Sequence, residues 1–215
     1  MISFLIKFFK RHKMFNGLIR EIAKVKSYQN NILSLKAKYR PKIGDSIAVN
    51  GACLSVISLQ KDGFELELSK ESRTHLALEN LKDRVHIEPA LRYKDRIDGH
   101  LMQGHIDGLG VLEKIVPNEN GLDFYLSLPA QLMPLMANKG SIGVDGVSLT
   151  INEVFSSQIR LTLIPLSLKD TLFKEYKIGR RIHIESDLLA RYIRAQLQGQ
   201  RRLSWEEVER ISYLY

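Results

Sequence analysis

The chain has 215 residues, of which 44% are hydrophobic and 26% are charged, as in an ordinary soluble protein with one large domain or two small ones. Its single cysteine excludes an intrachain disulfide framework and a cysteine-rich zinc site, and indicates a reducing, cytoplasmic location. The net charge of +8 invites a nucleic-acid hypothesis, but half of that charge lies in residues 1–13, so nucleic-acid binding is not predicted.

Residues 1–13, MISFLIKFFKRHK, are expected to form an N-terminal extension. Lys7 interrupts their apolar run, the charges follow that run, and no small-residue cleavage site comes after it, so a secretory signal is not predicted. The run is also far shorter than the roughly 20 residues that span a bilayer. A disordered extension or an upstream alternative start is favoured over an amphipathic helix on a membrane, and no membrane partner is predicted.

Three segments of the chain occur twice, in the same order. SIAVNGACLSV (46–56) matches SIGVDGVSLTI (141–151), RVHIE (84–88) matches RIHIE (181–185), and FNGLI (15–19) matches MQGHI (102–106) more loosely. Such ordered self-similarity predicts tandem copies of one domain. We place the two copies at residues 14–98 and 99–187.

Short β-type runs fill each copy. The first contains SIAVNG, CLSVISL, GFELEL and RVHIE, and the second contains GVLEKIV, DFYLSL, SLTINEV, IRLTLI and RIHIE. Several alternate apolar and polar residues, with Gly, Asn or Asp between runs. The only helix expected inside the second copy lies within residues 129–140, where Pro134 limits its length. The pattern predicts an all-β fold of small antiparallel barrels or sandwiches.

The spacing of apolar residues changes from that of strands to that of a helix after residue 187, and residues 188–215 are expected to be helical. An apolar stripe recurs at helical spacing in DLLARYIRAQLQ (187–198), formed by Leu189, Ile193 and Leu197 with Leu188 and Tyr192 beside them. Ser186 or Asp187 could cap this helix, and a capping box predicts a second helix over residues 204–215. Such a stripe either packs on its own domain or pairs with copies of itself in an oligomer.

Two histidines open the second copy, in DGHLMQGHIDG (98–108). A spacing of five residues puts His100 and His105 on different faces of a helix or strand, and no cysteine or carboxylate triad accompanies them, so no metal site is predicted. His100 is a candidate acid–base group, because the ordinary pKa of an imidazole is about 6.5, close to working pH. The alternative is an incidental histidine in a glycine-rich turn between domains.

Cys53 and Ser148 occupy the same position of the repeated phrase, and each is a potential nucleophile. A lone cysteine that begins an apolar run is often a packed small hydrophobe, but a serine in the sister copy argues against a purely structural position. Asp145 and Asp187 lie beside strand ends. Because an unpaired buried charge is costly, these carboxylates are either solvated or part of a site.

Five segments carry a resemblance to a known family: MFNGLI (14–19), GDSIAVNGACLSV (44–56), GHLMQGHIDG (99–108), KGSIGVDGVSLTI (139–151) and IHIESDLLARYI (182–193). They resemble riboflavin synthase of the alpha-chain, trimeric type, from Met14 to about Leu197. The resemblance implies two six-stranded antiparallel Greek-key barrels that bind lumazine, and a C-terminal helix that holds a homotrimer together. Active sites would then lie between neighbouring subunits.

The same resemblance implies a transferase reaction. Two molecules of 6,7-dimethyl-8-ribityllumazine exchange a four-carbon unit to give riboflavin and 5-amino-6-ribitylaminouracil, with no metal or redox cofactor. The alternative is a non-catalytic lumazine- or flavin-binding paralogue with the same fold.

Roles for individual residues also follow from the resemblance. The implied catalytic set comprises His100 and Ser148 in proton transfer, Cys53 and Ser148 as nucleophile or water-positioning groups, Lys139, Asp145 and Asp187 in orientation or charge stabilisation, and Phe15. Substrate contacts of the N-terminal barrel are implied at Gly17, Leu18, Ile19, Ser46, Ser55, Glu71 and Ser72. Those of the C-terminal barrel are implied at Gly104, His105, Ile106, Thr150, Ile164, Pro165, Leu166 and Ser167. The substrate-binding set also includes Cys53, Leu54, Glu67, Leu68, Ser69, Lys70, Lys139, Ser148, Leu149, Leu168 and Lys169.

The chain departs from the family's pattern in several places. Asn16 replaces a threonine, Pro89 stands where arginine is common, and Leu166 stands where an acidic residue is usual. Residues 71–78 also differ from the usual Glu-Thr-Leu-Arg sequence, and Phe15 lies behind thirteen extra residues. These departures are expected to alter contacts with the ring or the ribityl chain.

Overall fold

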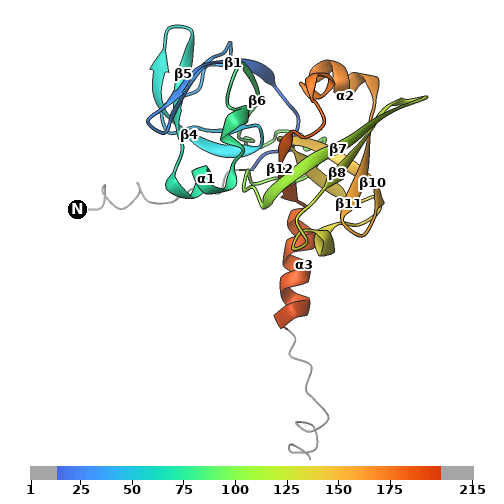
Figure 1. Ribbon diagram of the computed structural model, residues 1–215. Helices are drawn as coiled ribbons and strands as arrows, with labels where there is room; N and C mark the ends of the chain where they lie inside the picture. Colours follow the sequence, from blue (N-terminus) through green and yellow to red (C-terminus); the bar gives the residue numbers. More distant parts are fainter. Residues whose placement is uncertain (1–13, 200–215) are drawn as a thin grey trace, which may run out of the picture.

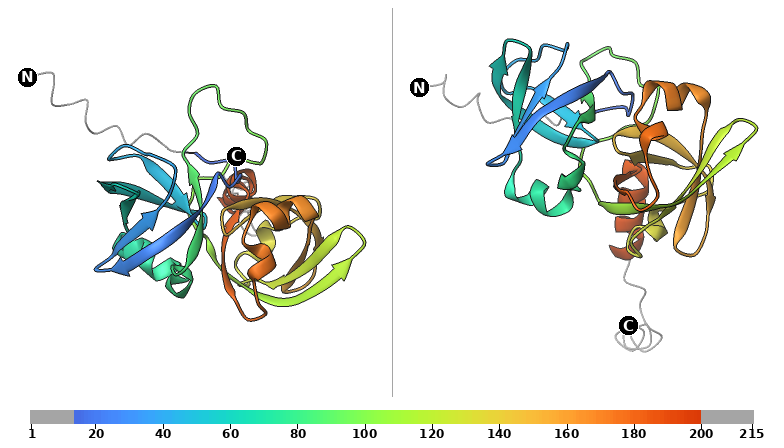
Figure 2. Two further views of the ribbon diagram at one scale, coloured as in Figure 1. Left: turned by 90° about the horizontal axis from the view of Figure 1, so that it is seen from above. Right: turned by 45° about the horizontal axis from the view of Figure 1, so that its top comes forward.

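The computed structural model of the protein describes residues 14–199, which form two closed six-stranded antiparallel barrels. The predicted N-terminal extension and the predicted helix over residues 204–215 lie outside the described residues. The barrels stand side by side, and the C-terminal helix extends away from them (Figures 1 and 2).

The N-terminal barrel closes in the order β1-β2-β5-β4-β3-β6. Its strands are β1 (Glu21–Gln29), β2 (Ile32–Lys36), β3 (Ser46–Val49), β4 (Ala52–Gln60), β5 (Gly63–Glu67) and β6 (Arg84–Pro89). Two short helical turns, α1 (Lys70–His75) and η2 (Leu78–Asn80), connect β5 to β6.

The C-terminal barrel repeats this topology, with the order β10-β11-β8-β7-β12-β9. Its strands are β7 (Gly108–Asn118), β8 (Gly121–Ser127), β9 (Ser141–Val144), β10 (Val147–Val154), β11 (Gln158–Leu163) and β12 (Arg181–Ser186). The turns α2 (Pro165–Asp170) and η4 (Phe173–Glu175) take the places of α1 and η2. The expected fold of two six-stranded antiparallel barrels is therefore confirmed.

Each barrel encloses its own hydrophobic core, built by strands whose alternate residues point inward. In β5, Phe64 and Leu66 are buried while Glu65 and Glu67 face outward, as the alternation predicts. In β8, Phe124 and Leu126 fill the same positions of the second core.

Several details differ from the expected elements. The helix expected within residues 129–140 is only the turn η3 (Met133–Leu135), because Pro134 lacks the N–H that a longer helix needs. The strands β1 and β2 are not anticipated, since Lys24, Lys26 and Lys36 obscure their apolar positions. Neither are α1 and α2, which have only six residues each.

The two copies of the repeated phrase meet where the barrels touch. Gly51 and Gly146 both have positive φ, and a Cβ on either would lie within 2.7 Å of the other's backbone nitrogen. Only glycine tolerates this approach. The matching Asn-Gly and Asp-Gly turns are therefore needed for the packing of one barrel on the other.

Two histidines of the matched RVHIE and RIHIE strands cross this contact in opposite directions. His86 Nδ1 lies 3.0 Å from the carbonyl oxygen of Asp145, and His183 Nδ1 lies 2.8 Å from that of Asn50. The Nε2 atoms of His86 and His183 accept hydrogen bonds from the backbone N–H groups of Leu172 and Ala77, respectively. Both rings therefore fit a neutral imidazole that donates at Nδ1 and accepts at Nε2. Burial lowers the pKa of His86, which favours this neutral form.

The helix α3 (Leu188–Gly199) follows β12 directly. Its N–H at Leu189 donates a 2.7 Å hydrogen bond to the Asp187 carboxylate, which confirms Asp187 as a cap. The predicted apolar stripe is exposed rather than packed on its own domain: Leu189, Ile193 and Leu197 are each at least 60% accessible.

Within residues 14–199, no helix is both long and apolar enough to cross a membrane.

Candidate active site

The two segments that lead into the barrels, residues 15–19 and 102–106, pair with each other. Phe15 and Met102 exchange two backbone hydrogen bonds of 2.8 and 3.0 Å in an antiparallel bridge. We call these segments the first and second leading segments. Because an antiparallel pair runs in opposite directions, the two segments diverge beyond the bridge toward different barrels.

Each leading segment crosses to the barrel that it does not belong to. The Gly17 carbonyl accepts a 2.9 Å hydrogen bond from the N–H of Ser148, and the Gly104 carbonyl accepts one of the same length from the N–H of Cys53. Ile19 packs on the core of the C-terminal barrel, and Ile106 packs on that of the N-terminal barrel. This corrects the expected distribution of contacts, because residues 17–19 lie against the C-terminal barrel and residues 104–106 against the N-terminal one.

Glycine is required at both crossings. Gly17 and Gly104 have φ values of +75° and +74°. A Cβ on Gly17 would lie 2.5 Å from the Ser148 nitrogen, and one on Gly104 would lie 2.6 Å from the Cβ of Cys53. The positions of Cys53 and Ser148 in the repeat thus have matching backbone surroundings.

A buried glutamate holds each leading segment in place. The Glu88 carboxylate accepts hydrogen bonds from the N–H groups of Asn16 and Gly17, at 2.8 and 3.0 Å. The Glu185 carboxylate accepts the equivalent bonds from Gln103 and Gly104, at 2.7 and 3.0 Å. Burial raises the pKa of both carboxyl groups to about 7, although the N–H donors favour the charged form. Both glutamates lie in the matched RVHIE and RIHIE motifs, but their function is not predicted from the sequence.

The C-terminal half-site, which we define by His100, Ser148 and the first leading segment, contains a polar pair. His100 Nδ1 lies 2.7 Å from Ser148 Oγ. Burial lowers the pKa of His100, and the nearby charge of Asp187 opposes this shift only in part. A neutral imidazole that accepts a hydrogen bond from the serine hydroxyl can take up and return a proton. The geometry therefore brings together two of the candidate catalytic residues, His100 and Ser148, and the charge of Asp187 acts on His100.

The N-terminal half-site is a pocket of about 520 Å³. It combines β4, the turn α1 and the second leading segment, and is lined by Ala52, Cys53, Ser69, Glu71, Ser72, His75, Leu76, Gly104, His105 and Ile106. The expected contacts Cys53, Ser69, Glu71 and Ser72 therefore share one cavity. His75 also lines it, although the sequence gives no periodic signal for the short helix that carries it. Ser69 caps that helix by accepting a hydrogen bond from the Ser72 N–H.

Four expected site residues are buried. The Phe15 side chain is 1% exposed and packs with Ala48 and Met102, and its catalytic role stays a prediction. Leu54 and Leu68 are buried in the core of the N-terminal barrel, so their side chains do not face the pocket.

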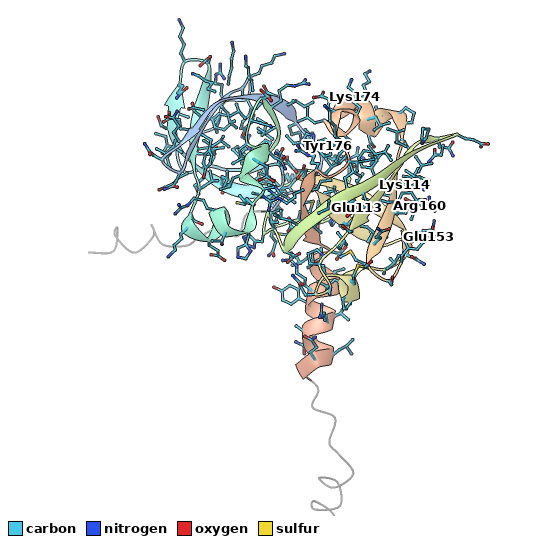
Figure 3. The ribbon with its side chains drawn as sticks, viewed as in Figure 1. Glu113, Lys114, Glu153, Arg160, Lys174 and Tyr176 are labelled. Atoms are coloured by element: carbon cyan, nitrogen blue, oxygen red, sulfur yellow. The ribbon has the colours of Figure 1, made fainter. Side chains whose placement is uncertain are left out.

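The fourth is Asp145, which lies fully buried at the contact between the barrels. Its carboxylate accepts hydrogen bonds from the Tyr176 hydroxyl at 2.5 Å and the His183 N–H at 2.8 Å, and it lies 3.3 Å from the Arg180 guanidinium. Figure 3 shows Tyr176 between the barrels. These contacts hold the Asp145 carboxylate at the contact between the barrels, and its catalytic role stays a prediction.

The remaining expected contacts are spread around the two half-sites. Ser46 is buried and pairs across the ladder with exposed Ser55. Exposed positions are occupied by Glu67, Lys70, Lys139, Thr150, Ile164, Pro165, Leu166 and Lys169. Partly buried positions are occupied by Leu18, Leu149, Ser167 and Leu168. Within the described part of the chain, no group of three or more His, Cys, Asp or Glu side chains could hold a metal ion.

Comparison with known proteins agrees with this geometry. The lumazine binding domain family matches residues 16–90 and 103–187. A riboflavin synthase of Photobacterium phosphoreum is 35% identical over 80% of this chain and 83% of its own length. That of Escherichia coli (strain K12) is 34% identical over 81% of this chain and 87% of its own length. The crystal structure of LumP complexed with 6,7-dimethyl-8-(1'-D-ribityl) lumazine shares the fold, with a TM-score of 0.68 and 20% identity over 80% of this chain and 98% of that one.

Proposed function

The chain belongs to the riboflavin synthase family, and from this membership we propose that it converts two molecules of 6,7-dimethyl-8-ribityllumazine into riboflavin and 5-amino-6-ribitylaminouracil. The observation that carries the proposal is a pair of half-sites with the same backbone frame and unequal side chains. Cys53 and Ser148 each donate an N–H to the leading segment of the other barrel, but their side chains differ in surroundings: Ser148 Oγ is hydrogen-bonded to His100, whereas Cys53 lines the pocket together with His75 and His105.

This inequality suits a reaction between two identical molecules. One lumazine loses a proton from its acidic 7-methyl group and becomes a carbanion, while the other is attacked at C7 by a nucleophile. A four-carbon unit then passes from one ring to the other. Holding the two rings together supplies roughly 7–11 kcal/mol of the barrier reduction, because a bimolecular encounter becomes an intramolecular one.

We assign the proton transfers to the His100–Ser148 pair. Its neutral imidazole and 2.7 Å hydrogen bond are the features that a general base needs. Cys53 serves as nucleophile or positions water in the N-terminal half-site, and Lys139 and Asp187 stabilise charge beside the C-terminal half-site. The exposed side chains of Thr150 and of residues 164–169 would contact the second lumazine.

We further propose that the active site forms between subunits of a homotrimer in the cytoplasm. Two features support this assembly. The helix α3 has an exposed apolar stripe, formed by Leu189, Tyr192, Ile193 and Leu197. Ile164 and Leu166, at the start of α2 in the C-terminal barrel, are also exposed. A neighbouring N-terminal barrel placed over the C-terminal half-site would bring the two lumazines together.

The test is to mix the purified protein with 6,7-dimethyl-8-ribityllumazine and follow the appearance of riboflavin by fluorescence. We expect riboflavin and the uracil product in equal amounts, because each turnover yields one of each. A non-catalytic paralogue would need the pocket but not the His100–Ser148 pair. Tight binding of the lumazine with no riboflavin formed would favour that alternative.

A further inference from the structure

We propose that Glu185 and Arg191 form a link that couples the position of α3 to the wall of the N-terminal pocket. Both are positioning residues, since neither lines the pocket. The inference rests on the proposed function in that it names a structural control of the same half-site.

The inner part of the link is the contact between Glu185 and the second leading segment. The Glu185 side chain is 1% exposed, and its two oxygens bind the N–H groups of Gln103 and Gly104. The carbonyl of Gly104 in turn accepts the N–H of Cys53. Gly104, His105 and Ile106 form one wall of the pocket. The carboxylate therefore fixes the start of that wall.

The outer part of the link is Arg191, which lies on α3. Its guanidinium donates hydrogen bonds of 3.4 Å to the Glu185 carboxylate, the Gln103 side-chain carbonyl and the Asp107 carboxylate. Asp107 is itself held by two 2.7 Å hydrogen bonds from Ser186, just before the helix begins. Arg191 thus contacts the two residues that flank the pocket wall, Gln103 before it and Asp107 after it. A planar guanidinium presents five N–H donors in a fixed fork that can reach separated acceptors, whereas a lysine ammonium is a compact charge with three donors.

The other half-site lacks this connection. Glu88 holds Asn16 and Gly17 in the same way, but β6 leads into the connection between the barrels instead of a helix. Among residues 14–199, no arginine is hydrogen-bonded to Glu88. A change in the packing of α3 should therefore reach the pocket at Cys53 and leave the Ser148 half-site largely undisturbed.

The single cysteine gives a readout that does not depend on turnover. Cys53 lies in the pocket, so its rate of alkylation by iodoacetamide reports on the wall beside it. We expect Arg191→Gln to raise this rate about threefold or more, since hydrogen bonds to charged groups hold the wall. Glu185→Gln, which turns one acceptor oxygen into a donor, should raise it further. Arg191→Lys should lie between wild type and Arg191→Gln.

Arg194→Gln is the matched control. Arg194 lies on the same helix and carries the same charge, but it donates to the Gln131 carbonyl and does not contact residues 103–107. This variant should label Cys53 at the wild-type rate and keep wild-type KM for the lumazine, whereas Arg191→Gln should raise KM about three- to tenfold with a smaller change in kcat.

Equal labelling rates and equal KM in Arg191→Gln and Arg194→Gln would overturn the link. Faster labelling in both would also overturn it, because it would show only that α3 had loosened. Sedimentation of each variant identifies a change in assembly. If the wild-type protein made no riboflavin, the proposed function would fail, but the labelling comparison would still decide on the link.

Discussion

The two barrels are most alike where they touch each other and differ in the side chains of the two half-sites. The glycines at the crossings, the glutamates that hold the leading segments and the histidines at the contact all occur in both. The side chain beside each crossing is different: Cys53 lies in an open pocket with His75, and Ser148 is hydrogen-bonded to His100.

This difference shows which parts of a duplicated domain are free to change. At the crossings, backbone hydrogen bonds join each barrel to the leading segment of the other, so a change in either glycine, or in a glutamate that holds a leading segment, would disturb both barrels. The side chains of Cys53 and Ser148 take no part in the backbone hydrogen bonds of the crossings. They could therefore diverge into two chemical roles while the frame stayed the same.

The largest expected effect separates the two half-sites chemically. His100→Gln and Ser148→Ala should each lower kcat by about 10²- to 10⁴-fold, the usual contribution of a general acid or base. Cys53→Ser should be milder, because a hydroxyl of similar size remains, and Cys53→Ala should cost more than Cys53→Ser. Stopped-flow or steady-state kinetics measure kcat, and thermal unfolding checks that each variant is folded. If Ser148→Ala lowered the melting temperature but left kcat per folded molecule intact, the serine would be a packing residue only.

The next effect tests whether turnover requires assembly of subunits through α3. Ile193→Asp in α3 places a charge in the exposed apolar stripe and should dissociate the proposed trimer, with turnover falling roughly tenfold or more, because a charged side chain opposes burial of the stripe between subunits. Gln198→Asp, about 140° around the helix from Ile193, is the control and should leave both unchanged. Sedimentation velocity reports the assembly. A wild-type sedimentation coefficient for Ile193→Asp would contradict the assignment of α3 to the subunit contact.

A smaller effect is expected in the pH profile. Burial lowers the pKa of His100 below the ordinary 6.5, so the protonated imidazole is the disfavoured form in the folded protein. The neutral base should persist as pH falls through 6.5 and be lost only below that value. Measuring kcat over about pH 5 to 8 should therefore place the acid limb below 6.5. An acid limb above pH 6.5 that disappears in His100→Gln would show that the pKa of His100 is raised, which would contradict this prediction.

The smallest expected effect on turnover distinguishes a structural carboxylate from a catalytic one. Asp145→Asn removes the buried partner of Arg180 and should lower the free energy of unfolding by about 1–3 kcal/mol, while kcat per folded molecule stays within about twofold. Glu153→Gln is the matched control. It removes a carboxylate on β10 that is paired with Arg160 on β11 of the C-terminal barrel (Figure 3). The Glu153 side chain is 46% exposed. An exposed pair is worth about 0–1 kcal/mol. A large loss of kcat in Asp145→Asn without loss of stability would restore the catalytic interpretation.

Local patterns in the sequence determined much of the architecture. The period-two alternation of residues 64–68 depends only on neighbouring residues, so it identified a strand correctly. The ordered repeats predicted two copies of one domain, and the stripe at Leu189, Ile193 and Leu197 predicted the helix α3, with Ser186 or Asp187 as its cap. The His100–Ser148 contact was anticipated only through the family resemblance, because the two residues are far apart in the chain.

Only the tertiary structure decided which surface each segment meets. Gly104 precedes its own barrel in sequence, yet its carbonyl accepts a hydrogen bond from the N–H of Cys53 in the other barrel, which no local pattern encodes. Likewise, the repeated Asn-Gly and Asp-Gly turns look like parts of two sites, but Gly51 and Gly146 pack against each other. Sequence periodicity specifies which face of a strand is apolar. Which distant backbone satisfies a given N–H or carboxylate depends on how the two barrels pack together.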